Sequence, residues 1–111
     1  MADVDLTATD FTAIAVTGLQ TMTVSGAVDV NVGNVYLDTT GGAIAASLAD
    51  AKEGQEIPLL MTVDGGTDAT LTPANYANGT TATFADVDDL LKLRFMSGEW
   101  HTVFNNGVVV A

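Results

Sequence analysis

The sequence predicts an all-β fold, a small antiparallel β-sandwich or barrel-like domain built from short hairpins. Glycine and asparagine punctuate the chain at intervals that suit short strands. The segments between them are rich in Thr and Val, whose β-branched side chains favour strands over helices. Several segments also alternate apolar and polar residues with a period of two, the pattern of a strand with one face toward a core.

The chain of 111 residues is short enough to form a single domain. We divide it into an N-terminal arm, residues 1–11, and one β-domain, residues 12–111. The arm is acidic and only weakly patterned. It is expected to be either a loosely docked tail or a segment that becomes ordered against a neighbouring molecule in an assembly.

The expected strands begin with Thr12–Val16 and Gln20–Val24, and Val35–Asp38 follows. The longest is Glu56–Asp64. One face of that strand carries Ile57, Leu59, Met61 and Val63, and the other carries Pro58, Leu60 and Thr62. The strand is therefore apolar on both sides. Pro58 has no N–H to donate, so it is expected at the start of its strand or at a sheet edge.

Glycine-containing turns predict two hairpins. The first joins Leu59–Asp64 to Asp68–Thr72 through Gly65-Gly66, because a glycine pair supplies the positive φ angles of tight primed turns. The second joins Leu90–Met96 to Glu99–Phe104 through Ser97-Gly98. Its large apolar side chains are the candidates for the subunit core or for contacts in a trimer: Leu91, Leu93, Phe95, Trp100 and Phe104.

Two segments have mixed signals. Ala43–Lys52 contains helix-favouring alanines, and Phe84–Leu91 has apolar residues at helical spacing after a possible capping pair. We interpret the first as a strand followed by a turn and the second as a turn followed by a strand. The flanking glycines leave little room for helices of ordinary length.

Charge excludes several classes of partner. Three basic and 14 acidic side chains give a formal charge of −11, which opposes nucleic acid and anionic lipid surfaces. Hydrophobic residues nevertheless make up 48% of the chain, more than a disordered acidic tail contains. No apolar run approaches the roughly 18 residues of a membrane span, and the acidic N-terminus does not resemble a signal peptide. We expect a soluble protein made in the cytoplasm.

No constellation of catalytic residues is present in the sequence. There is no cysteine, so thiolate metal sites, disulfides and cysteine nucleophiles are excluded. His101, the single histidine, follows no nucleophile motif. The acidic cluster Asp86, Asp88 and Asp89 does not match a calcium loop, and the glycines form no phosphate-binding loop. We therefore expect no enzyme activity, cofactor or metal.

The chain has only three basic side chains, Lys52, Lys92 and Arg94. Lys92 and Arg94 are two residues apart and share one face of their strand. In so acidic a protein, we expect this pair to meet an Asp or Glu from a neighbouring strand or from another subunit.

A series of turns and strand faces covers roughly residues 35–104 and resembles a family of virion proteins. Its parts are Leu37–Leu48, Glu53–Ile57, Val63–Gly66, Asp68–Thr72 and Gly98–Trp100. The series resembles the thin β-domains of tailed bacteriophages: trimeric fibre ends, head fibres and capsid decoration proteins. The resemblance carries no catalytic residue.

The resemblance implies an all-β homotrimer that works as a surface. A short chain without a fibre shaft is most similar to a capsid decoration (cement) protein, which binds the major capsid protein on the outside of the virion and stabilises the shell. The apolar side chains of the arm, Val4, Leu6 and Phe11, are then candidates for the capsid contact. The alternative is a short head or tail fibre that binds a host receptor, for which loop residues Asn75, Tyr76 and Asn78 are candidates.

Overall fold

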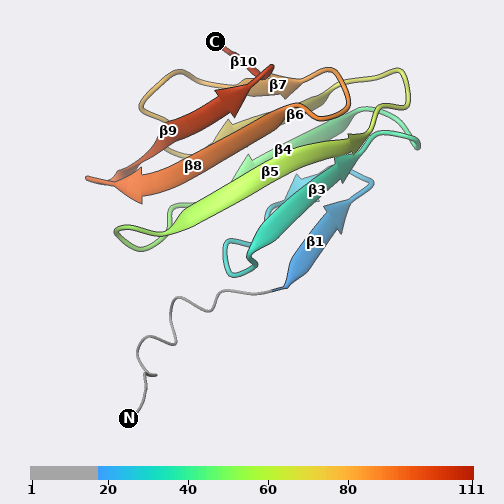
Figure 1. Ribbon diagram of the computed structural model, residues 1–111. Coiled ribbons are helices and arrows are strands. Elements are labelled where there is room, and N and C mark those ends of the chain that lie inside the picture. The colour runs from blue at the N-terminus through green and yellow to red at the C-terminus, as the bar shows by residue number, and fades with distance from the viewer. Residues whose placement is uncertain (1–17) are drawn as a thin grey trace.

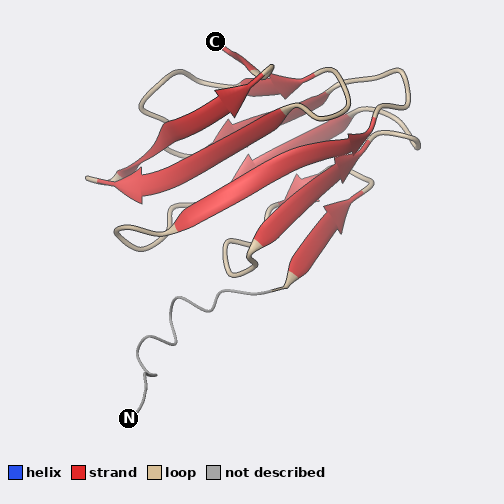
Figure 2. Ribbon diagram, viewed as in Figure 1, coloured by secondary structure: helices blue, strands red, loops and turns tan. Residues whose placement is uncertain are grey.

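The computed structural model describes residues 18–111 and contains only strands, turns and loops in that range (Figure 2). The predicted all-β class is confirmed. The expected strand Thr12–Val16 lies outside the described residues. The ten strands are β1 (Leu19–Met22), β2 (Gly26–Ala27), β3 (Asn34–Asp38), β4 (Ile44–Leu48), β5 (Glu56–Val63), β6 (Ala69–Pro73), β7 (Ala82–Phe84), β8 (Leu90–Met96), β9 (Glu99–Asn106) and β10 (Val109–Val110).

The strands form two five-stranded sheets that pack face to face as a sandwich (Figure 1). Sheet A has the order β1-β3-β5-β8-β9, and sheet B has the order β10-β7-β6-β4-β2. From β1 to β6, successive strands alternate between the two sheets. From β1 to β6 the backbone therefore winds from one sheet to the other and back, and each complete turn adds one strand to each sheet. We call this part of the chain the coil.

This coil makes the sheets mixed rather than purely antiparallel. The pairs β1–β3 and β3–β5 in sheet A are parallel, as are β2–β4 and β4–β6 in sheet B. The pairs that involve β7 to β10 are antiparallel. Parallel strands cannot be joined by a tight turn, so each connection in the coil passes through the opposite sheet.

The first predicted hairpin is wrong for this reason. The Gly65-Gly66 turn leads from β5 in sheet A across to β6 in sheet B, and the two strands do not pair with each other. The Gly65-Gly66 turn instead stacks on the connection between β3 and β4, one turn of the coil earlier. There the backbone N–H of Gly65 donates to Thr39 Oγ1 at 2.9 Å, and Thr39 is completely buried.

The second predicted hairpin, β8–β9, is confirmed. Met96 pairs with Glu99, and the two residues between them, Ser97 and Gly98, have φ angles of 55° and 81°. Positive φ at both central positions is the signature of a type I′ turn. A bulge interrupts the ladder and leaves Val103 as the extra residue on β9.

The two ambiguous segments are a strand with a turn and a turn with a strand, as predicted. Ala43–Lys52 contains β4 and then a loop, and its apolar side chains alternate between the core and the surface. Phe84–Leu91 turns after β7 and enters β8. Asp89 stabilises this turn, because its buried Oδ2 accepts the backbone N–H groups of Ala85 and Asp86, each at 3.0 Å.

The core lies between the sheets and is lined by the inward-facing residues of both. Trp100 is its largest fully buried side chain. Its indole N–H donates to the carbonyl oxygen of Ala49 at 2.9 Å, and its ring meets Phe95 edge to face at 5.3 Å. Trp100 therefore ties sheet A to the loop that leaves sheet B.

Pro58 is the third residue of β5 and pairs with Lys92 on β8. Met61 N–H donates toward β8, so the backbone nitrogen of Pro58, an odd number of residues away, points to the other side. On that side the pairing with β3 begins only at Leu59. The expectation of a strand start or a sheet edge is therefore wrong, because β5 is the central strand of sheet A; the proline is tolerated because its missing N–H faces the side where pairing with β3 has not yet begun.

Candidate interaction surface

The five candidate contact residues of the β8–β9 hairpin divide into two groups. Leu91, Leu93, Phe95 and Trp100 point into the sandwich and are buried within the single chain. They form the subunit core and are not free to contact another molecule. Phe104 is 51% exposed. It is the one member of the set that is available for an intermolecular contact.

Phe104 belongs to a bulky apolar patch on the outer side of sheet A. The strand period places Tyr36, Pro58, Leu60 and Leu90 on this side, because their neighbours in sequence are buried in the core. Tyr36 pairs with Leu60, and Leu60 with Leu90, so these side chains are direct cross-strand neighbours. We call these five residues the sheet A patch.

The outer side of sheet B has a different chemistry. The side chains of β4, β6 and β7 there are small and uncharged: Ala45, Ser47, Thr70, Thr72 and Thr83. Val109 of the edge strand β10 pairs with Thr83 and is the larger apolar group on this side, 61% exposed. Large apolar groups are therefore more numerous on the outer side of sheet A than on that of sheet B. Contiguous apolar groups on a soluble domain usually mark an interaction site, whereas small hydroxyl side chains remain well hydrated.

A groove with a volume of about 840 Å³ lies at one end of the sheet A patch. It is bounded by the β2–β3 loop, the β4–β5 loop and the outer side of β5 and β8. All three basic side chains of the chain line it: Lys52, Lys92 and Arg94. The acidic side chains in its lining are Glu53 and Glu56, so the groove carries a net charge of +1 in a chain of −11.

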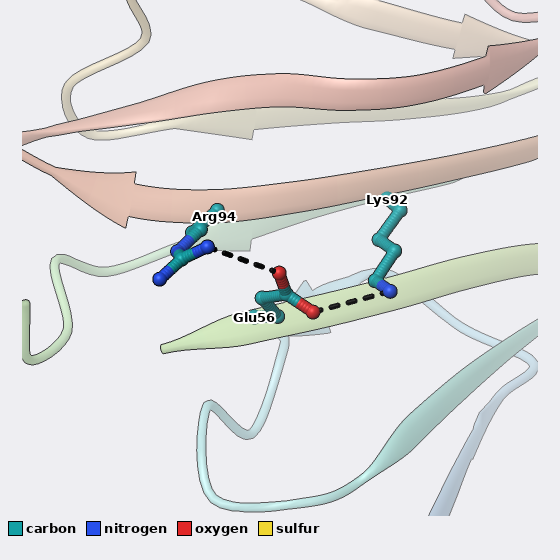
Figure 3. A network of polar contacts seen from close by, with 3 residues as sticks. All are labelled: Glu56, Lys92 and Arg94. Atoms are coloured by element: carbon teal, nitrogen blue, oxygen red, sulfur yellow. Dashed lines mark ion pairs between the residues drawn. The ribbon is translucent and has the colours of Figure 1, made fainter. Parts of the chain in front are cut away.

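Glu56 is the partner of both bases on β8 (Figure 3). Its carboxylate lies 3.1 Å from Lys92 Nζ and 3.8 Å from Arg94 Nη1. The neighbouring strand thus supplies the acid that the sequence predicted. The three side chains are 36–47% exposed, so water screens these pairs and each contributes at most about 1 kcal/mol.

The acidic cluster and the histidine have structural contacts. Asp89 is occupied by the backbone of its own turn, while Asp88 holds a positive φ of 74° there. His101 is half-buried, and its Nε2 lies 3.1 Å from the carbonyl oxygen of Met96. Within residues 18–111, no three His, Cys, Asp or Glu side chains are grouped so that they could hold a metal ion.

The loop residues proposed for a receptor contact bond within the chain. The Asn75 amide donates to both carboxylate oxygens of Asp50, and Asn78 Oδ1 accepts the backbone N–H of Thr102. The Tyr76 hydroxyl lies 2.6 Å from Thr102 Oγ1. These contacts fix the loop against the edge of β9, so the loop gives no support to the fibre alternative.

The arm residues Val4, Leu6 and Phe11 lie outside the described residues. No helix in the described part of the chain has the length and apolarity that a membrane crossing requires. Neither the scan against protein-family models nor the search of curated proteins returned a match to this sequence.

Sequence reasoning missed the groove. Three strands, β5, β6 and β7, lie between Lys52 and β8 in the sequence, so no local pattern indicates that Lys52 lies near Lys92 and Arg94. The only available signal was compositional: with just three basic residues in the chain, any shared location of all three is unusual.

Proposed function

We propose that this chain is a structural protein of a tailed-phage virion, a decoration (cement) protein that binds the major capsid protein on the outer surface of the shell and stabilises it. It acts as a homotrimer, and its function is to cover the outer surface of the shell rather than to catalyse a reaction. The observation that carries the proposal is the sheet A patch, a bulky apolar surface on a single small domain.

The patch supports self-association for an energetic reason. Phe104 is 51% exposed in the single chain and Leu60 is half-buried, and complete burial of a fully exposed large side chain contributes about 1.5–3 kcal/mol, so covering this patch gains part of that energy at each position. Residues around the patch are polar or charged, which is typical of the rim of a protein interface.

Charge distribution supports a role on a particle surface. Eleven of the acidic residues lie within the described chain, and the negative charge keeps a shell covered by many copies dispersed. The same charge disfavours contact with the packaged nucleic acid. The resemblance of the turn and strand series to the β-domains of phage virion proteins is the reason for proposing that the particle is a phage head.

Immunogold electron microscopy of purified phage particles tests the location. Antibody against the recombinant protein is expected to label the whole head surface. Label confined to the tail or to a single point on the head, or intact heads without label, contradicts the decoration role. Heads stripped of the protein should also rupture at lower temperature than complete heads, and the added protein should restore their resistance.

The trimer is tested with a surface variant and a matched control. Phe104→Ser removes an exposed aromatic group from the sheet A patch, and Val24→Ser removes an exposed apolar group, 71% accessible, from the turn that follows β1. Analytical ultracentrifugation is expected to show at least about tenfold weaker association for the first variant only. Equal behaviour of the two variants excludes the patch as the interface. Unchanged urea unfolding of both confirms that the fold is intact.

A further inference from the structure

The groove beside the sheet A patch is the one place in the described chain where positive charge predominates. Lys52 comes from the loop before β5, and Lys92 and Arg94 come from β8, so two segments distant in sequence converge there. Glu56 is shared between two of the bases, and its distance of 3.8 Å to Arg94 is near the limit of an ion pair. The bases therefore retain capacity for a further carboxylate.

We propose that this groove binds the acidic N-terminal segment, residues 2–10, of a neighbouring copy of the chain. The inference rests on the proposed homotrimer and adds a second contact between its copies, next to the sheet A patch. The segment carries Asp3, Asp5 and Asp10 and no basic side chain. Charge complementarity selects this segment, because it carries three carboxylates and no base. The other acidic side chains of the chain belong to residues 18–111, which form the sandwich itself.

The spacing of the charges matches as well. In an extended segment, Asp3 and Asp5 lie on one side, roughly 6.6 Å apart. Lys92 and Arg94 are also two residues apart on one face of a strand, and therefore have the same separation. An extended N-terminal segment can thus place one carboxylate against each base, with Asp10 left free to approach Lys52.

The chain enters the domain beside the groove. The carbonyl oxygen of Gly18 accepts the N–H of Gly33 at 3.2 Å, and Gly33 lines the groove. The eight Cα-to-Cα steps from Asp10 to Gly18 can span roughly 28 Å when the chain is extended. This length allows the acidic segment to extend beyond its own domain.

Symmetry favours a neighbouring copy over the same chain. A closed ring of three copies requires a heterologous contact, in which two different surfaces of one chain meet. The groove and the acidic segment are two such surfaces, and each copy offers one of each. This arrangement assigns the N-terminal arm to contacts between copies instead of the capsid contact expected from sequence.

Paramagnetic relaxation NMR on a mixed sample tests the contact directly. Because the chain has no cysteine, Val4→Cys accepts a single nitroxide label. Full-length protein labelled with ¹⁵N but without nitroxide is mixed with nitroxide-labelled protein at natural abundance, so that only contacts between copies are seen. We expect the amide signals of Gly33, Gly54 and Arg94 to lose most of their intensity, while those of the sheet B outer face keep it.

Two controls make the result specific. Asp3→Asn, Asp5→Asn and Asp10→Asn combined in the nitroxide-carrying copy should restore the groove signals, and so should 1 M salt, which shortens the screening length to about 3 Å. Three results each overturn the inference: groove signals that keep their intensity in the mixed sample, groove signals that are lost only when the nitroxide and the observed amide share one chain, and groove signals that stay broadened after the three aspartates are neutralised.

Failure of this inference and failure of the proposed function are distinguishable. Gold-labelled phage heads together with intact groove signals reject only the segment contact. Unlabelled heads reject the decoration role, whatever the mixed sample shows.

Discussion

Replacing Gly65 with alanine tests the stacked turns that make the first half of the chain a coil. An ideal Cβ on Gly65 would lie 2.3 Å from the carbonyl oxygen of Thr39 and 2.6 Å from the Cα of Thr40. Both are backbone atoms of the connection between β3 and β4, so they cannot rotate away as a side chain could. The φ angle of Gly65 is outside the left-handed region, so the expected penalty comes from this close approach alone.

The magnitude follows from two contributions. Forcing an extra methyl group against packed backbone costs about 1–3 kcal/mol. Separating the two turns also weakens the hydrogen bond from Gly65 N–H to Thr39 Oγ1, worth about 1 kcal/mol. We expect Gly65→Ala to lower the free energy of unfolding by about 2–4 kcal/mol, and the midpoint temperature by on the order of 10–20 °C.

Urea unfolding followed by tryptophan fluorescence is the assay, because Trp100 is the single tryptophan and is fully buried. Gly26→Ala in β2 is the matched control. Its ideal Cβ has no neighbour within 4 Å and its φ is ordinary, so its unfolding free energy should stay the same or rise by about 0.4–1 kcal/mol. Equal stability of the two variants would refute the stacked-turn topology, since a glycine at the tip of a free hairpin tolerates alanine.

Three further predictions concern single side chains. Trp100→Phe leaves the carbonyl of Ala49 without its donor and opens space in the core, so urea unfolding should show a loss of about 2–4 kcal/mol; a loss below 1 kcal/mol contradicts the role of this bond. Hydrogen bonds from the hydroxyl and then the backbone N–H of Thr40 hold the pKa of Asp38 below its ordinary value of 3.8. The folded state thus favours the carboxylate, and this stabilisation is complete above pH 3.8 and disappears as the pH falls through the lowered pKa; an NMR titration midpoint at or above 3.8 contradicts it. Glu56→Gln removes two screened ion pairs and should lower the unfolding free energy by less than about 2 kcal/mol, and this loss should shrink at high salt; a loss that is the same at low and high salt contradicts the screening.

Local patterns in the sequence determined the strands themselves. The alternation of Ile57, Leu59 and Met61 placed the core face of β5, and the Ser97-Gly98 pair placed the type I′ turn of the second hairpin. These features depend on side-chain periodicity and on the backbone freedom of a few turn residues. Both are properties of neighbouring positions, so they can be derived without knowledge of the tertiary structure.

Which strands pair was decided only by the tertiary structure. The Gly65-Gly66 turn has the composition of a hairpin turn, but the stacking of Gly65 on Thr39 directs the chain into the opposite sheet. A parallel pair such as β3–β5 joins residues more than 20 positions apart, and such partners leave no local signal. For the same reason, the sequence identified the apolar β8–β9 hairpin, but only the packing separates the buried Trp100 from the exposed Phe104.

The candidate surface follows the same division. Composition alone determined that the chain is acidic, lacks cysteine and contains only three bases. The convergence of Lys52 with Lys92 and Arg94 required the loop before β5 to close over β8, which is a consequence of strand order. Residue types set which chemistry the chain can offer, whereas long-range strand pairing sets where that chemistry is gathered, because it alone brings distant residues onto one face.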